Sequence, residues 1–128
     1  CRLDLNATPD ALPMMAVVAC FAEGQTTLAN VPQARIKETD RITTMRQELM
    51  KLGAKVTELP DGLVIEQSEL AGAEVNGHGD HRIVMALAVA GSAIKGETVI
   101  RTAEAAAVTF PTFVDCMRKL GAEIVEGD

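Results

Sequence analysis

The sequence predicts an α/β fold in which sheets cover buried helices, because apolar helical segments alternate with short β-rich runs and the pattern occurs twice. Residues 14–31 and 84–103 each read as an apolar helix, a Gly and a strand. Each is followed by an amphipathic helix that ends in Lys-Leu-Gly-Ala, at residues 51–54 and 119–122. A repeat of this length is typical of a duplicated lobe rather than of a solenoid.

The first copy is expected to follow the order β-α-β-α-β-β. Residues 1–6 read as the end of a strand, and residues 11–23 as a helix that is apolar on nearly all sides and therefore buried. A strand over residues 26–31 precedes a helix that starts near Thr39 or Asp40. That helix carries an apolar stripe at helical spacing, formed by Ile42, Met45, Leu49 and Leu52.

The remaining elements complete the repeat. Residues 55–66 form two β-rich runs around Pro-Asp-Gly, which indicates a hairpin. A short strand over residues 73–77 precedes a second buried apolar helix, which starts near Asp80. The last helix again has an apolar stripe, made of Phe110, Phe113, Val114, Met117 and Leu120. We therefore expect residues 1–128 to form a single partial domain of two lobes, about 1–70 and 71–128.

Composition excludes several functions. The net charge of −6 and the pI of about 4.9 mean that the molecule repels polyanions, and 2% aromatic residues leave no stacking platform for nucleic acid. No apolar run reaches the roughly 20 residues that span a bilayer, and no signal peptide is evident, so we expect a cytoplasmic protein. Neither a metal-ligand Cys/His spacing nor a nucleotide-binding Gly motif occurs, so no metal or cofactor is expected.

The cysteines predict no disulfide framework. They are odd in number and far apart in the sequence: Cys1, Cys20 and Cys116. We interpret them as buried, inert thiols in a reducing compartment.

Charged residues stand at the start of both buried helices. Asp10 and Asp80 are each interpreted as N-caps, with Pro13 tolerated in the first turn of its helix. His81 and Arg82 need another explanation, because a cation is unfavourable at a helix N-terminus by about 0.3–1 kcal/mol. One explanation is a bound anion, for which an Arg adds a bidentate fork. The alternative is that Arg82 pairs with a surface carboxylate.

A third helix start is also charged. Residues 35–42, RIKETDRI, lie between a strand and the helix beginning near Asp40, and Glu38 and Arg41 share one side of its first turn. A solvated surface would explain such a run. If the three helix starts converge, however, they form a cleft for a small substrate that bears phosphate and carboxylate. The carboxylates Asp10 and Glu38 would then move protons, and the cations Lys37, Arg41 and Arg82 would hold charge.

Five motifs resemble the C-terminal part of the EPSP synthase family, the 3-phosphoshikimate 1-carboxyvinyltransferases. In chain order they are PDALP, RIKETDRI, GDHRIVMA, TFPTF and KLGAE. The resemblance implies the enolpyruvyl transferase fold, in which each of two domains contains three β-α-β-α-β-β copies. The chain would then hold the last two copies of the C-terminal domain, without the N-terminal domain that forms the other wall of the cleft.

The family's reaction implies a role for each matching residue. Enolpyruvyl passes from phosphoenolpyruvate to the 5-hydroxyl of shikimate 3-phosphate by addition and elimination. Asp10 matches the base at the shikimate hydroxyls, and Glu38 matches the carboxylate that handles the methylene proton. The remaining matches are substrate contacts: Gln33 and Lys37 for the shikimate phosphate, Arg41 and Arg82 for phosphoenolpyruvate, and His81 beside them, oriented by Asp80.

One position departs from the family pattern. Many members carry a Lys just before the TFP-like stretch, where this chain has Val108. Two other functions stay open: a non-catalytic anion-binding or structural module, and the sister transferase that acts on UDP-N-acetylglucosamine. Without the other wall of the cleft, we expect the 128 residues alone to be inactive.

Overall fold

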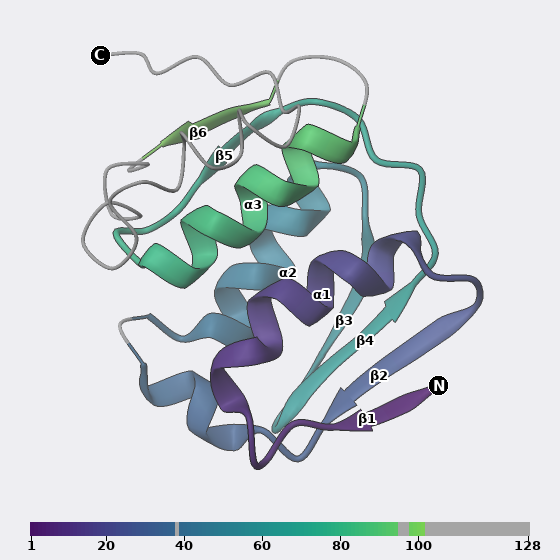
Figure 1. Ribbon diagram of the computed structural model, residues 1–128, viewed down its shortest axis with the longest axis vertical. Coiled ribbons are helices and arrows are strands. Elements are labelled where there is room, and N and C mark those ends of the chain that lie inside the picture. The colour runs from purple at the N-terminus through teal and green to yellow at the C-terminus, as the bar shows by residue number, and fades with distance from the viewer. Residues whose placement is uncertain (38, 95–97, 102–128) are drawn as a thin grey trace.

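The computed structural model describes residues 1–37, 39–94 and 98–101 (Figure 1). The predictions for Glu38, Val108, Cys116 and the last helix and strand lie outside the described residues. Within them, helices and strands form a mixed fold of the predicted class.

The first repeat has the expected order. It comprises β1 (Arg2–Asp4), α1 (Leu12–Phe21), β2 (Gln25–Ala29), α2 (Arg41–Lys51), β3 (Lys55–Leu59) and β4 (Gly62–Glu66), with short 3₁₀ turns η1 (Pro9–Ala11) and η2 (Pro32–Ile36) before the two helices. The four strands form one sheet in the order β1-β2-β4-β3, in which β1 and β2 are parallel and the other neighbours antiparallel. The predicted hairpin is confirmed between β3 and β4.

The second repeat begins with the same β-α-β unit. It consists of β5 (Glu74–Asn76), α3 (His81–Ala93) and β6 (Val99–Arg101), and β5 pairs in parallel with β6. Leu3 pairs with Leu28 across β1 and β2, and Val75 pairs with Ile100 across β5 and β6. Each helix therefore connects two parallel strands, as the duplicated pattern predicts.

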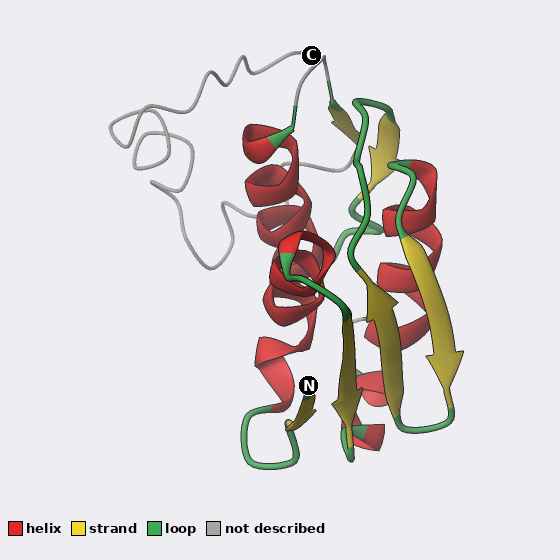
Figure 2. Cartoon of the chain, turned by 90° about the vertical axis from the view of Figure 1, so that its right-hand side faces the viewer, coloured by secondary structure: helices red, strands yellow, loops and turns green. Residues whose placement is uncertain are grey.

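Apolar side chains on one face of the four-stranded sheet form the core with the helices. Alternate strand residues point to this face, since side chains in a strand alternate between the two sides: Leu3, Leu28, Val56, Leu63 and Ile65. The predicted stripe on α2 is fully buried, and α3 lies along α1 (Figure 1). Figure 2 gives the view from the sheet side, with the strands beside the helices.

Two burial predictions need correction. The helix α1 is not buried all round, because Met14, Val18 and Phe21 are exposed along one side of it. Their spacing places them on a single face. The second correction concerns Cys1, which is exposed and not buried. Cys20 is buried as predicted, and burial raises the pKa of its thiol to about 11. Among the described residues, no helix has the length and apolar character needed to cross a membrane.

Candidate functional site

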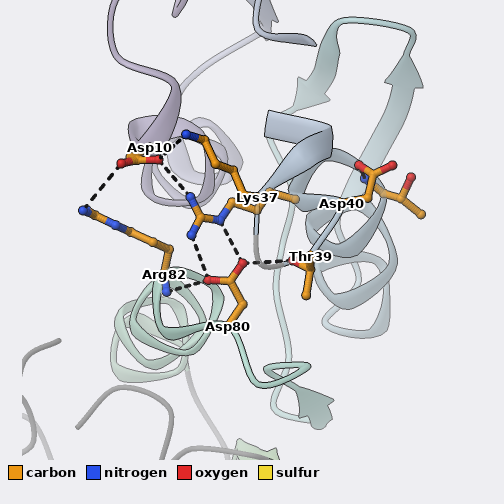
Figure 3. A network of polar contacts seen from close by, with 8 residues as sticks. Asp10, Lys37, Thr39, Asp40, Asp80 and Arg82 are labelled. Carbon is orange, nitrogen blue, oxygen red and sulfur yellow. Dashed lines mark hydrogen bonds and ion pairs between the residues drawn. The ribbon is translucent and has the colours of Figure 1, made fainter. Parts of the chain in front are cut away.

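The three charged helix starts meet around the carboxylate of Asp10 (Figure 3). Its Oδ1 lies 3.0 Å from Nη1 of Arg41 and 3.6 Å from Nζ of Lys37, while its Oδ2 lies 3.8 Å from Nη2 of Arg82. Asp10 comes from η1, Lys37 from the segment before α2, Arg41 from the first residue of α2 and Arg82 from the start of α3, so both repeats contribute. The expected convergence of Asp10, Arg41 and Arg82 is therefore observed.

Asp10 is not an N-cap, contrary to the sequence interpretation. The backbone N–H of Leu12 already donates to the carbonyl of Pro9 within η1, and Pro13 has no N–H. An N-cap side chain bonds to the second or third helical N–H, so the usual donors are absent here. The carboxylate turns instead toward the cations.

Asp80 is the N-cap of α3, as predicted, and it also has a larger role. Its Oδ1 accepts from the backbone N–H of Arg82 at 3.0 Å, and the residue is completely buried. The guanidinium of Arg41 binds the same carboxylate twice, and the Thr39 hydroxyl donates to it at 2.9 Å. Burial alone raises the pKa of Asp80, but the hydrogen bonds from Arg41 and Thr39 outweigh it and lower the pKa below its ordinary value.

Arg41 is the first residue of α2 and is only 1% exposed. A buried guanidinium requires a paired carboxylate, and Asp80 supplies one. The N-terminus of α2 is capped separately by Asp40, whose Oδ1 accepts from the backbone N–H of Thr43 at 3.2 Å. Arg41 can therefore point away from its own helix end and toward the shared site.

The charged run is not a solvated surface. Arg35 binds Asp40, Glu58 and the carbonyl of Leu59 at 2.7–2.9 Å, and thereby fastens the start of α2 to the β3–β4 hairpin. Together with the burial of Arg41, this arrangement contradicts the surface interpretation for most of the run. Among the described residues of the run, Ile36 and Lys37 are exposed, and Lys37 faces Asp10.

Arg82 leaves part of its binding capacity unused. Its side chain is 41% exposed, and its contact with Asp10 at 3.8 Å is too long for a hydrogen bond. Within the described part of the chain, its Nε is buried without a hydrogen-bond partner. Such an atom is costly unless an acceptor arrives, which favours the bound-anion explanation over a simple surface ion pair.

Gln33 and His81 are less directly placed. The Nε2 of Gln33 donates to the carbonyl of Asn6 at 2.9 Å, and its Oε1 is buried without a partner among the described residues. That bond holds Gln33 against the loop that leads to Asp10. His81 is the first residue of α3 and is partly exposed. Glu38 lies outside the described residues.

The charges of the site nearly balance. Asp80 offsets Arg41, which leaves the Asp10 carboxylate facing Lys37 and Arg82. Burial by itself raises the pKa of Asp10, but Lys37, Arg41 and Arg82 together bring the pKa below its ordinary value. Within the described ranges, no three His, Cys, Asp or Glu side chains are arranged to hold a metal ion. The arrangement suits an anionic ligand that competes with Asp10 for its cations.

Comparison with known proteins assigns the chain to a family. The model of the family described as EPSP synthase (3-phosphoshikimate 1-carboxyvinyltransferase) matches residues 1–117. The chain belongs to the EPSP synthase family.

Individual members of the EPSP synthase family are close in sequence. The 3-phosphoshikimate 1-carboxyvinyltransferases of Acetivibrio thermocellus and Ruminiclostridium cellulolyticum are each 62% identical over 123 residues, which cover 96% of this chain and 29% of each relative. That of Methanococcus aeolicus is 46% identical over 123 residues, with 95% of this chain and 28% of the relative covered. The chain thus spans under a third of the curated relatives it matches.

Solved EPSP synthases have the same fold. The structure of EPSP synthase from Acinetobacter baumannii superposes with a TM-score of 0.88 at 33% identity, over 95% of this chain and 30% of that one. The predicted enolpyruvyl transferase fold is confirmed.

Sequence reasoning missed the binding of Arg41 by Asp80 and the part played by Thr39. Asp80 was assigned only to capping and to orienting His81. The available signal was physical: an Arg at the head of an apolar helical stripe needs a carboxylate, and the segment before α3 offers one.

Proposed function

We propose that this chain is part of a 3-phosphoshikimate 1-carboxyvinyltransferase, which moves the enolpyruvyl group of phosphoenolpyruvate to the 5-hydroxyl of shikimate 3-phosphate. Membership of the EPSP synthase family supports this function. The structural observation that carries it is the Asp10 carboxylate, which faces Lys37, Arg41 and Arg82 at the junction of the two repeats.

The residues divide the reaction between proton transfer and charge binding. Asp10 takes the proton of the 5-hydroxyl as its oxygen attacks C2 of phosphoenolpyruvate, and Glu38 delivers a proton to the methylene carbon. The methyl group formed in this way then returns a proton to Glu38 as phosphate leaves, which restores the double bond. Arg41 and Arg82 bind phosphoenolpyruvate, Lys37 and Gln33 bind the shikimate phosphate, and His81 lies beside them.

Substrate binding would turn Asp10 into a stronger base. Without a ligand, Lys37, Arg41 and Arg82 lower the pKa of Asp10, which makes it a poor proton acceptor. Anionic groups that neutralise Lys37 and Arg82 would weaken this effect and raise the pKa. The cations thus keep Asp10 a weaker base until anionic groups of the substrates bind to Lys37 and Arg82.

The active site requires more protein than these residues. We propose that the chain supplies one wall of the cleft, in two lobes of about 1–70 and 71–128, and that an N-terminal domain supplies the other. The fraction of each relative that the chain covers supports this proposal. The exposed apolar face of α1, formed by Met14, Val18 and Phe21, is also consistent with further protein packing there.

The test uses the full-length protein that contains these residues. It should release phosphate from phosphoenolpyruvate only when shikimate 3-phosphate is present, and the 128-residue chain should release none. Turnover with UDP-N-acetylglucosamine instead of shikimate 3-phosphate would assign the sister reaction. Anion binding without turnover on either acceptor would reduce the function to an anion-binding module.

A further inference from the structure

A second buried carboxylate lies on α2, away from the group around Asp10. Glu48 follows Arg41 by seven residues, which is two helical turns, so both side chains project from the same face of α2. Each is 1% exposed. Both contact the stretch from Asn76 to Asp80, which joins β5 to α3, and Arg82 follows as the second residue of α3.

Glu48 contacts the beginning of this stretch at two points, the Asn76 backbone and the His78 ring, and it also pairs with Lys51 on its own helix. Its Oε1 accepts from the backbone N–H of Asn76 at 2.6 Å and from Nζ of Lys51 at 2.8 Å. Its Oε2 lies 3.4 Å from Nε2 of His78. A buried carboxylate is costly unless it is bonded in this way, so the contacts hold the backbone at Asn76 as well as the side chain.

The loop between these two anchors has an uncommon backbone. His78 has a φ of +54° and is followed by Gly79 at +71°. A residue other than Gly in this left-handed region costs about 1 kcal/mol, so the surroundings must maintain it. The N–H of His78 donates to Oδ1 of Asn76 at 2.7 Å, and the N–H of Asp80 donates to the carbonyl of Gly77 at 3.0 Å. The place of Asp80 therefore depends on the place of Asn76.

We propose that Glu48 is a positioning residue, which fixes the loop of residues 76–80 against α2 and thereby sets Asp80 and Arg82 relative to Arg41 and Asp10. A rigid helix holds the loop at both ends, at Asn76 through Glu48 and at Asp80 through Arg41. The effect of this positioning role on catalysis rests on the proposed function, but its effect on the conformation of the loop does not.

The test compares Glu48→Leu with Glu48→Gln in the full-length protein. The Leu variant removes the acceptor for the Asn76 N–H, whereas Gln retains one. We expect Glu48→Leu to raise the KM for phosphoenolpyruvate about tenfold, because Arg82 is displaced, with kcat within about twofold because Asp10 stands on another element. Glu48→Gln should have a KM for phosphoenolpyruvate close to that of the original protein. Lys51→Gln, which removes only the partner of Glu48 on α2 itself, should leave KM unchanged.

A second measurement is independent of the reaction. Amide hydrogen exchange at Gly77 and Asp80 should become about tenfold faster in Glu48→Leu than in the original protein. If the Leu variant does not fold, His78→Asn takes its place, since Asn tolerates a positive φ but loses the ring contact, and exchange should then be about threefold faster.

The outcomes separate the two proposals. Absence of transferase activity in the original protein would refute the proposed function, while faster exchange would still support the positioning role. Unchanged exchange at both amides would refute the positioning role whatever the activity. The variant Ile65→Ala, which changes a buried core residue on the sheet, is a further control. If its KM rose as much as that of Glu48→Leu, a general loss of stability would explain the effect and the positioning role would be refuted.

Discussion

The guanidinium of Arg41 binds the carboxylate of Asp80 in a two-pronged pair, with Nε 2.8 Å from Oδ2 and Nη2 3.0 Å from Oδ1. Both residues are essentially buried, and they come from different repeats. The pair joins the start of α2 to the start of α3, while Nη1 of Arg41 donates to Asp10. It is therefore both a structural link and one side of the candidate site.

Replacing Asp80 by Asn should destabilise the protein by about 3 kcal/mol, because breaking one side of a buried ion pair leaves a charge without its partner. Asn keeps the helix cap, so loss of the pair dominates the effect. Equilibrium unfolding in urea measures the change. Asp40→Asn, at the partly exposed cap of α2, is the matched control and should cost about 1 kcal/mol or less. Equal losses would show that the buried pair has no special weight.

Stability should fall in acid below about pH 4, and Asp80 should account for part of the fall. The folded-state pKa of Asp80 is lowered from the ordinary value of 3.8 by Arg41 and Thr39, which overcome the opposing effect of burial. A lowered carboxylate pKa gives stability that is present above the unfolded value and lost as pH falls through the folded one. Unfolding free energies measured between pH 6 and pH 2 should have a shallower slope in Asp80→Asn. An unchanged slope would contradict this assignment.

Arg82→Ala should weaken binding of phosphoenolpyruvate about tenfold or more, since hydrogen bonds to charged groups contribute roughly 1.5–3 kcal/mol. The side chain is partly exposed and its Nε lacks a partner among the described residues, so stability should change little. Isothermal titration of the full-length protein measures the affinity. Arg2→Ala, at an exposed position on β1, should bind as the original protein does. Unchanged affinity in Arg82→Ala would remove Arg82 from the anion site.

The sequence predicted the regular elements well, because their periodicities are local. The apolar stripe from Ile42 to Leu52 indicates a helix, and Pro-Asp-Gly at residues 60–62 indicates a turn. Each signal lies within a short stretch of sequence. The exposed face of α1 could not be predicted, because an apolar pattern on nearly all sides of a helix does not show which side is left uncovered in the described part of the chain. Asp10 was misassigned for a local reason, the missing donor at Pro13, which the sequence already contained.

The candidate site was predictable as a set of residues but not as a set of pairs. The three charged helix starts and the resemblance to the EPSP synthase family make Asp10, Arg41 and Arg82 one candidate set. Which carboxylate binds which cation depends on the docking of α3 against α1 and α2, which involves contacts between distant parts of the chain. For this reason the sequence suggests only a helix cap for Asp80 and only a substrate contact for Arg41. The bond between the two side chains is not evident from it.

Asp10→Asn should have opposite effects on binding and on catalysis. The Asp10 carboxylate competes with an incoming anion for Lys37 and Arg82, so its neutralisation should tighten phosphate binding about two- to fivefold, the range of a partly exposed ion pair. If Asp10 is the general base, kcat of the full-length protein should fall by about 100-fold or more in the same variant. Phosphate titration and steady-state kinetics measure the two effects, with Asp61→Asn in the β3–β4 turn as a carboxylate control expected to change neither. Weaker phosphate binding in Asp10→Asn would show that Asp10 positions the cations for the anion and does not compete with it. An unchanged kcat would show that another residue is the general base.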